Sequence, residues 1–167
     1  MIACIDIESG LGDENGNLLF DLPKDMKHFI SSTTGKTIVM GRKTWDSLPK
    51  KPLKNRKNIV LTNSMSVGEL VAYKEVDNVS VCNSIEEVLE LSKTEDIFII
   101  GGGEIYNQFM PYADELIITH VHTVSDIAVT FFPEFGIEDW KITKVVENEA
   151  DDEHAFKFIF ANYSRKK

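Results

Sequence analysis

The chain has 167 residues, 43% of them hydrophobic, and 27 acidic against 18 basic side chains give it a formal charge of −9. This length and composition predict one globular domain spanning residues 1–167, and the charge argues against a nucleic-acid binder, whose affinity depends on neutralising phosphates. No apolar stretch approaches the roughly 18 residues that a membrane span needs, and no signal-peptide pattern opens the chain. We therefore expect a cytoplasmic monomer that does not associate with membranes.

Runs rich in Ile, Val and Phe predict eight strands. In chain order they cover residues 1–7, 36–40, 58–61, 79–82, 97–100, 116–121, 141–146 and 156–161. Several of the earlier runs are continuously apolar, as in parallel strands buried on both faces. The last two partly alternate between polar and apolar residues, which is typical of an antiparallel pair.

The first predicted helix begins at Pro23, because proline suits an initial helical position. Met26, Phe29, Ile30 and Thr33 follow at helical spacing and form a stripe that we expect to face inward.

Three further helices are predicted. A short one covers residues 42–48, and another covers residues 84–92, where Ser84 and Glu87 have the spacing of a capping box. The last begins after three consecutive glycines and stops before Pro111. Strands that alternate with helices over the first two-thirds of the chain predict the α/β class, with a mostly parallel sheet and an antiparallel C-terminal edge.

Cys4 and Cys82 are the only cysteines, and each falls within a predicted strand. Buried free thiols are the expected state in a reducing cytosol, although the sequence alone does not exclude a disulfide. No metal-ligand spacing surrounds either residue, so no metal site is predicted.

Asp25 lies in the first turn of its predicted helix, at the border of the apolar stripe. An acid at this position is commonly no more than a partner for the helix dipole. The alternative is a carboxylate in a partly apolar pocket, with a pKa raised by desolvation, that can serve a heteroaromatic ring.

Two glycine-containing segments resemble nucleotide-binding loops without matching the standard motifs. Gly101 to Gly103 lie between a buried strand and a helix, which lets the backbone approach a phosphate closely. Tyr106 replaces the last glycine of a dinucleotide fingerprint, and Ile30 stands where the leading glycine of a P-loop would precede Gly35.

Residues 42–57 contain seven Lys or Arg and one acid, Asp46. Such a run is usually a solvated loop, but a focused positive patch also attracts phosphates and carboxylates. Because Gly41 ends a buried strand, the residues after it predict a phosphate site at the carboxyl edge of the sheet. Arg42 and Arg56 are the basic candidates.

The segments LPKDMKHF, IVMGRKTWDSL, NRKNIVLTNS and IIGGGEIYNQFMPYADELIITHV occur in the order and spacing of dihydrofolate reductases, and the resemblance covers essentially the whole chain. It implies an eight-stranded, mostly parallel sheet with about four flanking helices. It also implies reduction of 7,8-dihydrofolate to 5,6,7,8-tetrahydrofolate with NADPH, in support of one-carbon and thymidylate metabolism. Antifolate inhibitors would then be further ligands.

The resemblance also implies residue roles. Asp25 is similar to the acid that hydrogen-bonds the pterin, Thr119 resembles its hydroxyl partner, and Arg56 resembles the arginine that pairs with the glutamate tail of folate. The other substrate-binding residues that it implies are Ile2, Cys4, Met26, Phe29, Leu48, Leu53 and Ile100.

For NADPH, the resemblance implies phosphate contacts, with a cis peptide between the first two of the three glycines. The cofactor-binding residues implied are Gly12, Gly41, Arg42, Lys43, Thr44, Thr62, Asn63, Ser64, Gly101, Gly102, Gly103, Glu104, Ile105 and Tyr106.

The chain departs from the family pattern in several places. Phe20, expected in the catalytic site, replaces the usual tryptophan and lacks its N–H donor. Residues 10–17 form a glycine-rich stretch that suits a moving lid, and Val129 replaces an acid that often latches it. Glu104 stands where some members have an arginine for the cofactor.

Two alternatives stay open. A related NADPH-dependent reductase would act on a pyrimidine of the riboflavin pathway, although Arg56 favours a folate tail. A catalytically weak or inactive folate or nucleotide binder is suggested only by Phe20, whereas Asp25 and Thr119 argue against it.

Overall fold

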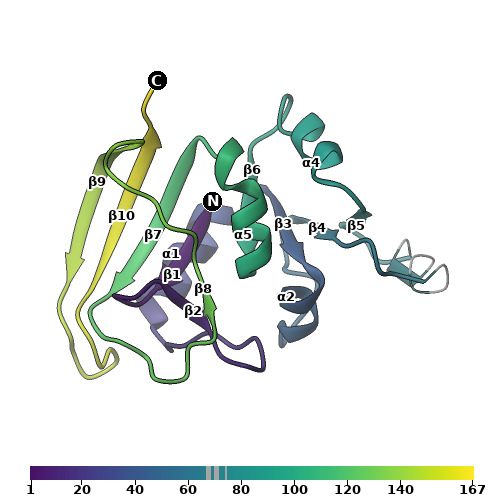
Figure 1. Ribbon diagram of the computed structural model, residues 1–167. Helices are drawn as coiled ribbons and strands as arrows, with labels where there is room; N and C mark the ends of the chain where they lie inside the picture. Colours follow the sequence, from purple (N-terminus) through teal and green to yellow (C-terminus); the bar gives the residue numbers. More distant parts are fainter. Residues whose placement is uncertain (67–68, 70–71, 74) are drawn as a thin grey trace.

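The computed structural model describes all residues of the chain except 67–68, 70–71 and 74 (Figure 1). The helices are α1 (Pro23–Thr33), α2 (Arg42–Ser47), α4 (Ile85–Leu91) and α5 (Gly103–Phe109), with a 3-10 turn, η1 (Met110–Tyr112). The strands are β1 (Ile2–Ile5), β2 (Gly10–Gly12), β3 (Thr37–Gly41), β4 (Lys57–Leu61), β5 (Val79–Cys82), β6 (Ile97–Gly101), β7 (Glu115–Val121), β8 (Thr130–Phe131), β9 (Trp140–Asn148) and β10 (Phe158–Arg165).

The eight predicted strands form two hydrogen-bonded ladders that lie side by side. One has the order β5-β4-β3-β6 and the other β1-β7-β10-β9, while the inner strands β6 and β1 contact each other (Figure 1). All pairings in these ladders are parallel except those of β10, which runs antiparallel to both β7 and β9. The predicted parallel sheet with an antiparallel C-terminal edge is therefore confirmed.

The central strands are buried on both faces, as their continuous apolar runs predicted. All five residues of β3 are buried. Ile38 and Met40 pack in one cluster with Trp45 of α2, whereas Val39 belongs to a second cluster with Val88 of α4 and the buried side of α5. Because successive residues of a strand face opposite sides, α2 covers one face of the sheet, and α4 and α5 cover the other.

Some element boundaries differ from the prediction. β1 ends at Ile5, because the Asp6 carboxylate accepts the N–H groups of Glu8 at 2.9 Å and Gly10 at 2.7 Å and so turns the chain. The small antiparallel pair of β2 and β8 was not predicted. Strands of three and two residues are too short to carry a recognisable alternation.

The prediction that the apolar stripe of α1 faces inward is only partly correct. Thr33 is fully buried and Phe29 is half-buried, but Met26 is 45% and Ile30 46% exposed. The helix instead turns polar groups inward, since Thr33 accepts a hydrogen bond from Arg56 Nε at 2.8 Å and Asp25 contacts β7. Apolar spacing located this helix correctly but did not specify which face is buried.

Cys4 and Cys82 are both free thiols, as expected, but only Cys82 is buried, whereas Cys4 is half-buried. Within the described part of the chain, no helix is both long and apolar enough to cross a membrane. The same residues contain no group of three His, Cys, Asp or Glu side chains placed to hold a metal ion.

Candidate active site

The Asp25 carboxylate lies where α1 passes over β7. The parallel pairing of β1 with β7 sets Cys4 opposite Thr119, and the Thr119 hydroxyl donates a hydrogen bond of 2.6 Å to Asp25 Oδ1. Burial raises the pKa of Asp25 above its usual range, while the hydrogen bond from Thr119 and the charge of His28 act in the opposite direction. The site therefore holds a carboxyl group that is easier to protonate than one in water.

Two groups beside Asp25 remain protonated. Burial, followed by the neighbouring Asp25, raises the pKa of the Cys4 thiol, which is therefore no thiolate nucleophile. The Tyr106 hydroxyl donates to the backbone oxygen of Ile2 at 2.6 Å, and burial raises the pKa of this phenol. The side chain of Ile2 is buried, so only its backbone can meet a ligand.

Phe20 packs at the apolar side of this region. Its ring lies edge-on to Phe156 at 5.9 Å between centroids. Together with Cys4 it borders the cluster formed by Leu22 and Phe158. Phe20 and Cys4 thus pack against the same small hydrophobic cluster. Helix α1 begins at Pro23, directly after Leu22 of this cluster.

Arg56 is 8% exposed and is held rigidly next to α1. Its Nε donates to Thr33 at 2.8 Å, Nη1 donates to the Lys54 carbonyl at 2.9 Å, and the guanidinium lies 5.7 Å from the centre of the Phe29 ring. Among the described residues Nη2 makes no hydrogen bond, so one donor nitrogen remains for an acidic ligand. Burial lowers the pKa of Arg56 from its ordinary value, which leaves the group charged.

The other predicted substrate residues border the same side of the sheet. Leu48, Leu53 and Ile100 are partly buried and pack against the cluster of Ile38 and Trp45. Met26 and Phe29 present apolar surface from α1. These side chains offer an apolar contact surface near the charged groups.

The glycine segments after β3 and β6 lie together at the carboxyl edge of the sheet. The peptide bond between Gly101 and Gly102 is cis, as the resemblance implies, and Gly101 has a φ of +128°. A Cβ on Gly102 would come within 3.3 Å of the Thr44 hydroxyl, and one on Gly41 within 2.9 Å of Ile105 Cγ1. A side chain at either position would crowd these neighbours, so glycine keeps the close backbone approach open, which fits the binding of a pyrophosphate. Ile105 itself is buried in the core, so its side chain does not face a ligand.

Arg42 follows β3, and the segment Thr62 to Ser64 follows the neighbouring strand β4. The register pairs Gly41 with Leu61, so both segments emerge at the same edge, where Thr62 and Ser64 share a hydrogen bond of 3.1 Å. Arg42 is engaged within the chain: Nη2 donates to Glu69 at 2.7 Å, and Nε lies 3.3 Å from Asp46. Arg42, which is predicted to bind a cofactor phosphate, is therefore already paired with acidic side chains of its own chain.

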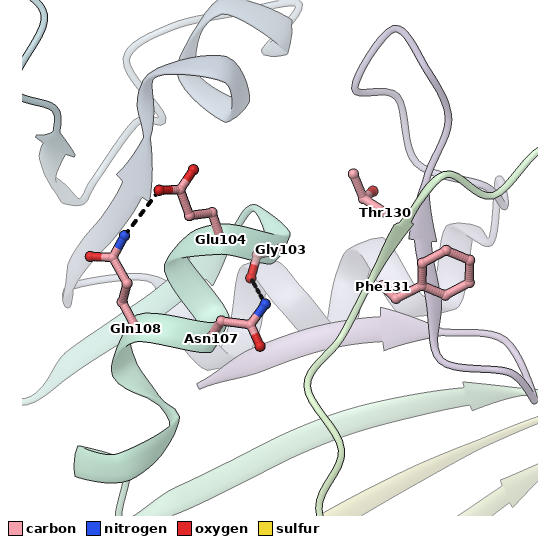
Figure 2. A pocket seen from close by; sticks show the side chains of 6 residues that line it. All are labelled: Gly103, Glu104, Asn107, Gln108, Thr130 and Phe131. Atoms are coloured by element: carbon pink, nitrogen blue, oxygen red, sulfur yellow. Dashed lines mark hydrogen bonds between the residues drawn. The ribbon is translucent and has the colours of Figure 1, made fainter.

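A cavity of about 530 Å³ lies between α5 and β8. Its lining is Gly103, Glu104, Asn107, Gln108, Thr130 and Phe131, and Figure 2 shows the α5 side chains across from those of β8. Gln108 donates to Glu104 at 3.3 Å, and Thr130 donates to the Gly12 carbonyl at 3.3 Å. Three predicted cofactor residues, Gly12, Gly103 and Glu104, thus lie at or next to this cavity.

Several residues of the region were not predicted. Asn107 and Gln108 lie one turn after Gly103 and Glu104 on the same face of α5, a spacing that could have indicated them. Thr130 carries no such local signal, because its place beside α5 depends on the pairing of β8 with β2. His154 was missed as well. Its Nε2 accepts the backbone N–H of Lys24, one residue before Asp25, at 3.1 Å.

The site thus has two parts. In one, the Asp25 carboxylate, whose pKa is raised, is hydrogen-bonded to the hydroxyl of Thr119. In the other, two glycine segments meet at the carboxyl ends of parallel strands. In α/β proteins such an edge is where nucleotides bind, so the fold and the site define a nucleotide-dependent α/β enzyme.

Comparisons with known proteins identify the family. A family model described as dihydrofolate reductase matches residues 1–165. The chain is 34% identical over 166 residues to a dihydrofolate reductase of Bacillus subtilis, covering 99% of this chain and 93% of that protein. It is 36% identical over 162 residues to one of Staphylococcus aureus, covering 97% and 94%.

A solved structure, the dihydrofolate reductase from Enterococcus faecalis complexed with NADP(H) and RAB-propyl, matches with a TM-score of 0.86 and 28% identity, over 99% of this chain and 95% of that one. The chain belongs to the dihydrofolate reductase family.

Proposed function

We propose that this protein reduces 7,8-dihydrofolate to 5,6,7,8-tetrahydrofolate with NADPH, acting as a monomeric single catalytic domain over residues 1–167. The observation that carries the proposal is the half-buried Asp25, hydrogen-bonded to Thr119, in a chain of the dihydrofolate reductase family. A cytoplasmic location is supported by the two free thiols, which suit a reducing compartment.

Asp25 is the residue that holds the pterin. Its Oδ1 is engaged by Thr119, so the other carboxylate oxygen accepts N–H donors of the pterin ring and its amino group. The raised pKa of Asp25 favours a proton shared between carboxylate and ring. Polarisation of the ring in this way makes the adjacent C=N bond a better hydride acceptor, and a proton must reach its nitrogen.

Arg56 and the apolar side chains hold the rest of the substrate. The free Nη2 of Arg56 pairs with a carboxylate of the glutamate tail. Phe29, beside that guanidinium, packs against the aminobenzoyl ring. Leu48, Leu53 and Met26 supply the rest of this apolar contact. Phe20 packs beside the pterin without offering the donor that tryptophan would supply.

NADPH supplies the hydride when it is bound. Thr44 and Gly101 to Gly103 are the residues that would hold its pyrophosphate, because the glycines leave space next to the Thr44 hydroxyl. Arg42, Lys43 and the Thr62 to Ser64 segment would hold the adenosine phosphate at the same edge. The role of all these residues is to bind and orient, and so to bring the two reacting carbons together.

The test is NADPH oxidation with dihydrofolate, followed by the loss of nicotinamide absorbance. Asp25→Asn is expected to lower kcat by at least about 100-fold, the usual lower range for loss of a positioned acid or base. Asp21→Asn removes the same charge from an exposed position four residues earlier and is expected to keep wild-type turnover. Equal activity of the two variants would contradict the role of Asp25. Binding of both ligands without turnover by wild type would identify an inactive binder.

A further inference from the structure

A second cavity, of about 300 Å³, lies between α1 and the antiparallel part of the sheet. Two cross-strand rows form its floor on one face of the sheet. One row runs from Ile117 through Asn162 to Lys144, and the next contains Phe160 and Val146. His28 lies above them on α1. This cavity contains none of the predicted substrate or cofactor residues.

His28 carries an unsatisfied polar atom in this cavity. Its ring stacks on Phe160 with centroids 4.1 Å apart and planes 26° apart, which fixes its orientation. Nε2 is buried and has no hydrogen-bond partner among the described residues. An unpaired buried group of this kind destabilises a fold, and in a native protein it calls for a ligand or another explanation.

The other polar side chains that line the cavity are those of Ser31, Ser32, Lys144 and Asn162. Lys144 is the charged one among them, and Ser31 donates to the His28 carbonyl at 3.0 Å. Lys144 forms no ion pair with any described residue, and it sits opposite Asn162 in the ladder. The Asn162 side chain likewise makes no hydrogen bond within the described part of the chain. Burial lowers the pKa of His28 most, the nearby Asp25 carboxylate raises it, and Lys144 lowers it further. The lowered pKa leaves His28 a neutral polar partner, so Lys144 supplies the positive charge that attracts an anion here, in a chain of net charge −9.

The cavity walls restrict the kind of anion. Ile117, Val146 and Phe160 provide the apolar part of the floor, Asn162 and Lys144 lie beside them in the same sheet, and His28 lies on α1. Its volume is at the lower end of the roughly 300–1,000 Å³ typical of small-molecule sites. A fully hydrated ion such as phosphate would make no apolar contact with the floor. A carboxylate attached to a compact apolar group would contact both the apolar floor and the polar side chains.

We propose that this cavity binds a small organic monocarboxylate, with its carboxylate between His28 and Lys144 and its apolar body on Phe160 and Val146. The row that contains Phe160 and Val146 also contains Thr119, the partner of Asp25. An occupant therefore lies next to the Asp25–Thr119 pair without touching it. The proposal does not depend on the reaction that the protein catalyses.

Benzoate is the probe, and the His28 ring resonances of the full chain are the readout, identified by their loss in His28→Phe. We expect a saturable shift at millimolar benzoate, and no comparable shift with benzyl alcohol, which has the same ring and no charge. Lys144→Gln is expected to weaken benzoate binding about fivefold, as for loss of a partly exposed ion pair. Lys141→Gln, on the same strand but outside the cavity, is expected to bind like wild type.

Three results would overturn the proposal. They are the absence of any His28 shift, an equal shift with benzyl alcohol, and unchanged benzoate affinity in Lys144→Gln. NADPH oxidation with dihydrofolate is measured on the same samples, so a failure of this site is distinguishable from a failure of the proposed reaction.

Discussion

At the scale of single residues, Asp25 is under two opposing influences. A carboxylate in the first turn of a helix is stabilised by the helix dipole, and Thr119 donates to it as well. Burial nevertheless dominates and raises its pKa. The charged side chain is thus held in a less favourable environment than water, which suits binding of a cationic or donor-rich ring but disfavours folding near neutral pH.

This conflict predicts a pH-dependent effect of Asp25→Asn on stability. A carboxyl group with a raised pKa in the folded state stabilises the fold below its unfolded pKa, and this contribution is lost as the pH rises through the folded pKa. At pH 7 Asp25→Asn should therefore have a higher free energy of unfolding than wild type. The difference should shrink at about pH 3, below the ordinary Asp pKa of about 3.9.

Urea unfolding at both pH values measures this effect, with Asp21→Asn as the matched control. Asn can still accept from Thr119, so the local hydrogen bond is retained. A variant that is less stable than wild type at pH 7 would show that hydrogen bonding, and not burial, dominates at Asp25.

At the scale of elements, α1 depends on a distant residue for its first turn. Leu22 occupies its N-cap and offers no side-chain acceptor. The Lys24 N–H instead donates to Nε2 of His154, whose Nδ1 lies 2.7 Å from Asp151. His154 is 4% exposed and comes from the connection between β9 and β10. That connection therefore positions the helix turn that carries Asp25.

His154→Ala should lower the free energy of unfolding by about 1 kcal/mol, the usual effect of losing an N-cap acceptor. It should also lower kcat for dihydrofolate reduction more than it changes the Kd for NADPH, because Asp25 is displaced and the glycine segments are not. His154→Gln offers an amide oxygen as acceptor and should recover part of both losses. Equal losses in the Ala and Gln variants would mean that ring packing on Phe158, at 5.1 Å, is what matters.

At the scale of the whole molecule, the charge distribution opposes binding of a phosphorylated cofactor. The chain is acidic overall. Its basic segment at residues 42–57 is partly neutralised by Asp46 and Glu69, which both pair with Arg42. Glu69 accepts the N–H and hydroxyl of Ser66, both at 2.8 Å, and pairs with Arg42 at 2.7 Å. The pKa of Glu69 is lowered to about 2. The hydrogen bond from the Ser66 backbone N–H is the largest cause, and the hydrogen bond from Arg42 is the next. A cofactor phosphate that binds Arg42, as proposed, must compete with this ionised carboxylate.

Glu69→Gln should therefore tighten NADPH binding by about threefold to fivefold, the range of a partly exposed ion pair, and should leave NADH binding unchanged. Fluorescence quenching by each nucleotide measures the two affinities. Glu75→Gln removes the same charge from an exposed position nearby and is the control. If NADH gains as much as NADPH, or if Glu75→Gln acts equally, the effect is one of overall charge and not of competition at Arg42.

The amino-acid sequence by itself determined the features that depend on neighbours within a few residues. The apolar runs located β3, β4 and β6, and Ser84 accepts the Glu87 N–H at 3.4 Å as the capping-box spacing predicted. α5 ends at Phe109, before Pro111 as predicted, and Pro111 lies in the 3-10 turn η1. The family resemblance, carried by contiguous motifs, predicted Asp25 and the glycine segments as site residues.

Only the tertiary structure decided which of these segments meet. The insertion of β10 between β7 and β9, the polar inward face of α1 and the pairing of Arg42 with Glu69 have no local signature. The bond from Lys24 to His154 spans 130 positions in the chain. Contacts at such separations depend on strand order and packing. The entropy cost of closing a long loop is compensated only once the whole sheet has formed.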